Sequence, residues 1–214
     1  GWEKRSNSST AEGKENIAYH GAGHATISWH LEYADPLVKV RIVPRGQALG
    51  AAWYLPEERQ LTSEQHILDK ICALLGGRAA EEIFFGILDT GALSDLEQAT
   101  RRAYAMVTYF GMSDKLKNIS YYDSTGQSEF GFSKPYSEAT AQLIDREVQR
   151  IIDEQYERAK QILLQYKDGH NEVAQILIDR EVLFAEDLEK VFGKRQWASR
   201  AEEILNSEEL EVRS

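Results

Sequence analysis

The chain has 214 residues and a formal net charge of −10, and its 42% hydrophobic content is enough to fill a folded core. This acidic balance disfavours binding to nucleic acid or to anionic membrane surfaces, both of which carry negative charge. The single cysteine, Cys72, excludes an internal disulfide and a cysteine-based zinc site. No apolar run reaches the ~20 residues that span a bilayer, so we expect a soluble intracellular domain.

The first predicted element is a long helix. Residues 1–10 are expected to be a flexible lead-in, because they are polar and show no apolar periodicity. Ser9 and Glu12 have the spacing of a capping box, which predicts a helix that runs to about Tyr33. The helix contains three glycines, Gly13, Gly21 and Gly23. Each lowers the intrinsic stability of the helix by roughly 1 kcal/mol relative to alanine, so the helix needs tertiary support.

Two short strands are predicted next. Apolar and basic residues alternate over Val38–Ile42, which is typical of a half-buried strand. Pro44 ends it, Arg45-Gly46-Gln47 is a predicted turn, and Ala51–Leu55 is a predicted second strand. We therefore expect a small β element with an exposed edge.

The middle of the chain is predicted to be helical. Thr62 and Gln65 form a second capping-box pattern that opens a helix with apolar residues at helical spacing. Gly76-Gly77 either ends this helix or permits close packing before Arg78–Phe85 continues it. Both alternatives fit the pattern.

Further helices are predicted in the second half. Ser94 and Glu97 form a third capping-box pattern, and the helix after it stops at Gly111. The Gly-, Ser- and Tyr-rich segment 112–136 is a predicted long loop. The longest helix is predicted from Ser137 to Gly169, with shorter helices over 172–178 and 185–191 and a charged tail over 194–214. The pattern as a whole indicates a mainly α fold with a small β element.

The pair His20 and His24 is the most informative local feature. Histidines at i and i+4 project from one face of a helix, so their imidazoles can share a metal ion. The metalloprotease motif H-E-x-x-H has this spacing, with glutamate as the general base, but Gly21 stands in the glutamate position here. A chance pair of surface or capping histidines is an equally good interpretation of the spacing alone. The other histidines are expected to be structural: His30, His66 and His170.

A metal site also needs a third ligand, and the candidates are carboxylates. Asp95 falls in the first turn of a predicted helix, and Glu81 and Glu82 lie on the preceding helix. Each also has an ordinary interpretation, because acidic residues favour first turns and solvated helix faces. Composition alone does not choose among them.

The stretch Ala18–Ala25 resembles the AYHEAGHA motif of the FtsH-type, ATP-dependent zinc metalloproteases (peptidase family M41). The likeness extends from about Ile17 to Phe192 through an ordered series of further motifs: 42–46, 49–50, 55–58, 74–82, 90–92, 95–96, 99–100, 111–113 and 137–138. This resemblance implies a zincin-like, mainly helical peptidase domain over residues 11–193. It also implies a homohexameric ring of such domains below an AAA+ ATPase.

The resemblance further implies a set of site residues. The zinc (Zn²⁺) ligands would be His20, His24 and Asp95, with Ser94 standing where the family usually has asparagine. Glu82 would lie near the site without binding the metal. An unfolded polypeptide substrate would add as a β-strand to the edge strand formed by Gly50, Ala51, Ala52 and Trp53.

Two departures from the family pattern matter. The ATPase module, with its ATP and Mg²⁺, and the transmembrane segments are expected to be missing. The whole protein would be anchored in the inner membrane with this domain in the cytoplasm, whereas the present fragment would be soluble.

The second departure is Gly21, which stands where the family has its general-base glutamate. Zinc should therefore still bind, while peptide hydrolysis largely fails. The favoured origin of Gly21 is an engineered or incidental change in an otherwise catalytic lineage. A natural pseudo-protease, acting as a scaffold or chaperone-like partner, is the alternative.

Overall fold

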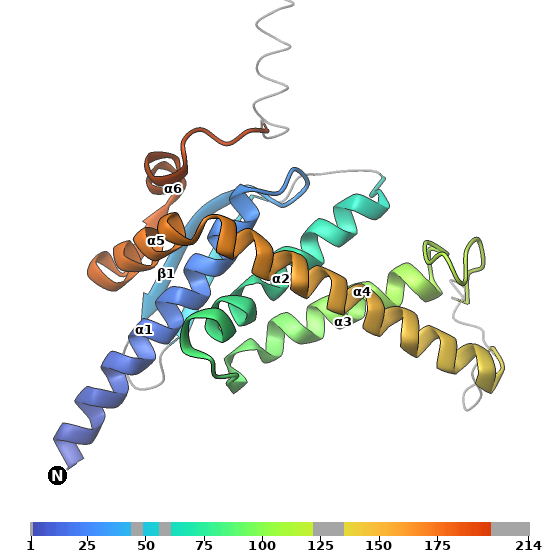
Figure 1. Cartoon of the computed structure of the whole chain (residues 1–214), viewed down its shortest axis with the longest axis horizontal. Helices are drawn as coiled ribbons and strands as arrows, with labels where there is room; N and C mark the ends of the chain where they lie inside the picture. The colour runs from blue at the N-terminus through green and yellow to red at the C-terminus, as the bar shows by residue number, and fades with distance from the viewer. Residues whose placement is uncertain (1, 44–48, 56–60, 122–134, 198–214) are drawn as a thin grey trace, which may run out of the picture.

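The computed structural model describes residues 2–43, 49–55, 61–121 and 135–197, and it confirms a mainly helical fold with one small sheet (Figure 1). Among these residues, no helix is long and apolar enough to cross a bilayer. The elements follow in the order α1 (Trp2–Trp29), β1 (Leu37–Val43), β2 (Leu49–Tyr54), α2 (Glu64–Phe85), the 3₁₀ turn η1 (Thr90–Ala92), α3 (Leu93–Thr108), α4 (Glu138–Gln165), α5 (Lys167–Arg180), β3 (Val182–Phe184) and α6 (Ala185–Phe192).

The sheet is antiparallel, with strand order β2-β1-β3. Val40 in the central strand lies opposite Ala52 of β2 and Leu183 of β3. The first two strands match the predicted pair, β3 was not predicted, and the predicted turn at residues 45–47 lies outside the described residues. Strand β2 is at the edge of the sheet, so its outer side has no strand partner among the described segments.

Within the described part of the chain, three apolar clusters hold the helices together. The first packs α1 and α5 against the sheet through residues such as Ala22, Val40 and Leu177, and Figure 1 shows the sheet behind these two helices. The second joins α2, α3 and α4, and the third joins α1, α2 and α4. Because α1 belongs to both the first and the third cluster, its histidine-bearing segment is clamped between the sheet and α2.

Helices α1 and α2 approach each other at glycines. A Cβ atom on Gly23 would lie 2.6 Å from the Gly76 carbonyl oxygen and 2.7 Å from the Ala80 Cβ. Helix α2 runs without a break through Gly76 and Gly77. The close-packing interpretation of the two glycines is therefore correct, and the interpretation that they end the helix is wrong.

Several predicted helix boundaries are wrong. Helix α1 begins at Trp2, so Ser9 and Glu12 lie inside it rather than at its start. The cap of α2 is Ser63, whose hydroxyl accepts from the His66 amide, rather than Thr62. Helix α4 does begin after Ser137, as predicted.

Two further boundaries also differ. Helix α3 starts at Leu93 with no side-chain cap, because η1 leads directly into it, so Ser94 does not cap as predicted. Gly169 does not end a helix, since α5 spans it. The ring of Phe192 from α6 occupies the space where a Gly169 side chain would lie. Of the predicted loop and tail, residues 122–134 and 198–214 lie outside the described residues.

Candidate metal and substrate site

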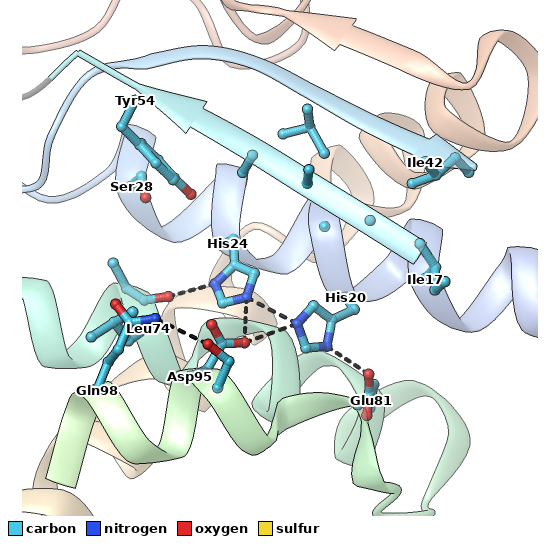
Figure 2. Close-up of a pocket in the computed structure, with 18 of the residues that line it drawn as sticks. Ile17, His20, His24, Ser28, Ile42, Tyr54, Leu74, Glu81, Asp95 and Gln98 are labelled. Atoms are coloured by element: carbon cyan, nitrogen blue, oxygen red, sulfur yellow. Dashed lines mark hydrogen bonds and ion pairs between the residues drawn. The ribbon is translucent and has the colours of Figure 1, made fainter. Parts of the chain in front are cut away.

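Three side chains from two helices converge on one point (Figure 2). His20 and His24 project from α1, and Asp95 projects from the first turn of α3. Asp95 Oδ2 lies 3.1 Å from the Nε2 atom of each histidine, and the two Nε2 atoms are 3.0 Å apart. Donor atoms around a tetrahedral zinc ion lie about 3.3 Å apart, so the spacing suits a single small cation.

The outward-facing ring nitrogens are held by α2. His20 Nδ1 lies 2.6 Å from Glu81 Oε1, and His24 Nδ1 lies 2.7 Å from the Ala73 carbonyl oxygen. A carbonyl oxygen only accepts, so we assign a proton to Nδ1 of His24, and by the same logic to Nδ1 of His20 beside the Glu81 carboxylate. In the neutral rings both Nε2 atoms then carry lone pairs. Two lone pairs and a carboxylate oxygen meet with no donor between them, an arrangement that requires a cation.

The electrostatics of the cluster favour positive charge. Burial by itself would lower the pKa of His20, but hydrogen bonds to Asp95 and Glu81 outweigh it and raise the pKa to about 9. Burial would raise the pKa of Asp95, but its close contacts with His20 and His24 hold that pKa well below its usual range. Without a metal, a proton on His20 Nε2 therefore fills the place between the three groups. Imidazole nitrogen and carboxylate oxygen are also a zinc donor set.

Two glycines make room at this site. Gly77 of α2 faces the His20 ring so closely that a Cβ atom there would overlap it. Gly21 is buried and faces the sheet, where a Cβ would lie 3.1 Å from Val40 Cγ1 and 3.5 Å from Leu177 Cδ1. Gly21 also lines the cavity that contains the two histidines. Position 21 therefore lines the cavity through its backbone and carries no side chain.

An elongated cleft runs from the cluster along strand β2. Gly50, Ala51, Ala52 and Tyr54 line it, and Figure 2 shows the strand passing over His20 and His24. Burial raises the pKa of Tyr54 to about 12, so its hydroxyl, which is bonded to Ser28, stays protonated at neutral pH. Trp53 does not line the cleft, and Lys39 lies 4.6 Å above its ring. The structure thus brings three of the four predicted strand residues to the cleft, but not Trp53.

Glu81 replaces Glu82 as the glutamate beside the cluster. The Glu82 carboxylate contacts the Tyr156 hydroxyl instead, and it is absent from the cleft lining. Adjacent residues on a helix point about 100° apart, so only one of the pair can face His20. The feature of the sequence that could have distinguished Glu81 from Glu82 is Gly77. It lies one turn before Glu81, on the α2 face that meets the His20 ring.

His30 and His170 lie away from the cluster and are structural, as predicted. His30 bonds the Thr26 carbonyl and stacks on Tyr166, with ring centroids 3.6 Å apart. His170 bonds the Tyr19 carbonyl through Nε2 and is fully buried. Both are part of the helix packing.

Comparison with known proteins gives a consistent result. Residues 7–191 match the model of peptidase family M41. The chain is 64% identical over 209 residues to an ATP-dependent zinc metalloprotease FtsH of Parabacteroides distasonis, covering 98% of this chain and 30% of that protein. It is 49% identical over 200 residues to an FtsH of Rhodothermus marinus, covering 92% of this chain and 29% of that protein.

A eukaryotic relative extends the match. The chain is 44% identical over 201 residues to the mitochondrial inner membrane m-AAA protease component AFG3L2 of Mus musculus, covering 94% of this chain and 25% of that protein. The chain thus spans less than a third of the length of these relatives.

Proposed function

Because the chain belongs to peptidase family M41, we propose that it is the zinc-binding peptidase domain of an FtsH-type protease, and that Gly21 impairs its chemistry. The observation that carries this proposal is the convergence of His20 Nε2, His24 Nε2 and Asp95 Oδ2, which lie 3.0–3.1 Å from one another. The residues fit the metal that the relatives' names imply. His20, His24 and Asp95 would hold Zn²⁺, and Glu81 and the Ala73 carbonyl would orient the imidazoles.

Zinc bound there would act as a Lewis acid toward a peptide carbonyl and would make a water molecule more acidic. The protein's own residues set the geometry of the substrate. The free edge of β2 offers backbone N–H and C=O groups to an extended polypeptide, which would lie over the histidines. Backbone pairing reads no side chains, so the domain would accept unfolded polypeptides of varied sequence.

The missing component is a proton acceptor at position 21. A glutamate there would start from a backbone position that lines the cleft, between the two histidines in the sequence. Gly21 offers no group that can take a proton, and a positioned general base contributes roughly 10²–10⁴-fold to the rate. We infer that the chain binds zinc and substrate but cleaves peptides very slowly.

We extend the proposal to the whole protein. Two relatives are named as ATP-dependent and a third as an inner-membrane m-AAA protease component, which supports an ATP-using AAA+ domain in the whole protein. We add to this proposal the homohexamer and the Mg²⁺ that the family resemblance implies. Such a protein would be anchored in the inner membrane with this domain in the cytoplasm. Its substrates would be unfolded or membrane polypeptides.

A second function rests on the same glycine. If the lineage itself lacks the base, the domain would be a pseudo-protease that serves as a scaffold or chaperone-like partner of active subunits. The two functions differ in whether a base restored at position 21 brings back cleavage, because a long-inactive site accumulates further losses.

Metal analysis tests the site directly. The purified chain should bind about one equivalent of zinc. His20→Ala, His24→Ala and Asp95→Ala should each weaken binding strongly, since each removes one of three protein ligands. Undiminished zinc in all three variants would overturn the assignment.

A further inference from the structure

The cleft has an uneven distribution of charge. Its only basic lining residues among the described part of the chain are Lys70 and Arg102. Both lie near Asp35, which adjoins the end of the cleft where β2 finishes at Tyr54: Lys70 Nζ is 3.4 Å from Asp35 Oδ2, and Leu55 bonds the carbonyl of Pro36. At the opposite end, where β2 passes Ile17 at Gly50, Figure 2 shows an acidic lining residue, Glu81.

Arg102 is placed to face a ligand. It lies on α3 two turns after Asp95, with Gln98 between them on the same face, and all three line the cleft. Figure 2 shows Gln98 below Tyr54, at the end of the cleft away from Ile17. The Nε atom of Arg102 is buried and has no hydrogen-bond partner among the described residues. A partly desolvated guanidinium with one unsatisfied N–H is less stable than one whose donors all bind carboxylate oxygens.

We propose that Arg102, assisted by Lys70, forms a pocket that binds an acidic side chain of the substrate at the Tyr54 end of the cleft. This proposal rests on the proposed function, because it assumes that a substrate strand adds to β2. Asp35 neutralises one of the two cations, and the pocket therefore retains a net charge of about +1 for a single carboxylate.

The direction of the substrate follows from the sheet. All described strand pairs are antiparallel, and antiparallel pairing is the commoner arrangement, so a substrate strand is assigned an orientation antiparallel to β2. Its amino-terminal half then lies at the Tyr54 end. The favoured Glu or Asp is therefore on the amino-terminal side of the scissile bond.

Non-specific attraction cannot produce this preference. The chain has a net charge of −10, so the field of the whole molecule repels an acidic peptide. A preference for acid must come from a local contact. Added salt should weaken it, since Arg102 and Lys70 are both partly accessible to solvent.

Equilibrium binding measures the preference without turnover. Fluorescein-labelled Ala/Ser/Val peptides with one Glu, placed at each position in turn, are titrated into the full zinc-loaded chain, with Gln peptides as neutral matches. At one position the Glu peptide should bind about tenfold more tightly than its Gln match, the size expected for a charge-assisted contact. Arg102→Gln should abolish that ratio, and Lys70→Gln should reduce it. The control is Arg101→Gln, the exposed neighbour on α3, which should leave it unchanged.

The outcomes separate the two proposals. Equal binding of Glu and Gln peptides at every position, or a preference that survives both Arg102→Gln and Lys70→Gln, would overturn the pocket and leave the proposed function intact. Absence of binding by every peptide would overturn substrate addition to β2, and the pocket with it. Preserved zinc content and melting temperature in each variant show that a lost preference is local.

Discussion

Glu81 Oε1 lies 2.6 Å from Nδ1 of His20, so a buried carboxylate on α2 fixes the ring that α1 supplies to the proposed metal site. The contact holds the Nδ1 proton in place and leaves Nε2 directed at Asp95. It also adds negative charge next to the ligand set, which makes the imidazole a better donor. Glu81 is therefore expected to control metal affinity without touching the metal.

Glu81→Gln should weaken zinc binding by about 10–100-fold, because the charge is lost while an amide oxygen can still accept from Nδ1. The matched control is Glu82→Gln, one residue along, whose carboxylate contacts Tyr156. Competition against a chelator of known affinity measures both. Equal losses in the two variants, or a larger loss for Glu82→Gln, would contradict the assignment.

Two glycine substitutions should separate the site from the fold. Gly77→Ala places a Cβ against the His20 ring, so it should displace that ring and reduce zinc affinity. Gly23→Ala places a Cβ against the Gly76 backbone, which cannot move freely, so it should cost about 1–3 kcal/mol of stability. Zinc titration and urea unfolding on both variants measure the contrast. The opposite pattern, with Gly77→Ala the less stable and Gly23→Ala the weaker zinc binder, would show that the packing is misassigned.

His170 should make the domain sensitive to acid. Burial lowers its pKa to about 4, although the bond to the Tyr19 carbonyl opposes this, whereas an unfolded histidine has a pKa near 6.5. Between these values the unfolded chain binds a proton that the folded chain excludes. The free energy of unfolding should therefore fall as the pH drops from about 6.5 to 4, by up to roughly 3 kcal/mol.

Urea unfolding of the metal-free chain from pH 4.5 to 7 measures this slope. His170→Gln should flatten it, since glutamine can still donate to the Tyr19 carbonyl and does not titrate. Comparing slopes rather than absolute stabilities removes the packing cost of the substitution. Identical slopes in the two proteins would show that another group is responsible.

The sequence predicts most of what depends on local spacing. The i,i+4 spacing identified the face shared by His20 and His24, and alternation over Val38–Ile42 identified β1. Asp95 could be chosen among the carboxylates only through the family resemblance, because its contact with the histidines joins residues more than seventy positions apart.

The errors arise where tertiary packing decides. Ser94 and Glu97 have the spacing of a capping box, but η1 continues directly into α3, so Ser94 lies inside the helix and does not cap it. Gly169 would favour a helix end, but it stays helical because Phe192 fills the space beside it. The choice between Glu81 and Glu82 likewise depends on which face of α2 meets α1, a relationship that periodicity within α2 does not determine.

We propose that this site keeps its metal ligands and lacks only a base at position 21. Gly21→Glu tests it, with Gly21→Gln as the control of nearly equal size. Val40 must move by a few tenths of an ångström in both variants, which should offset much of the roughly 0.5–1 kcal/mol gained in helix propensity. The variants therefore differ chiefly in whether the new side chain can accept a proton.

The measurement is turnover of a short flexible peptide by the zinc-loaded chain, Gly21→Glu and Gly21→Gln, with zinc content determined on the same samples. Gly21→Glu should cleave about 10²–10⁴-fold faster than the chain itself, and Gly21→Gln should not. Equal, near-zero turnover by all three proteins at full zinc occupancy would contradict the claim and favour the pseudo-protease.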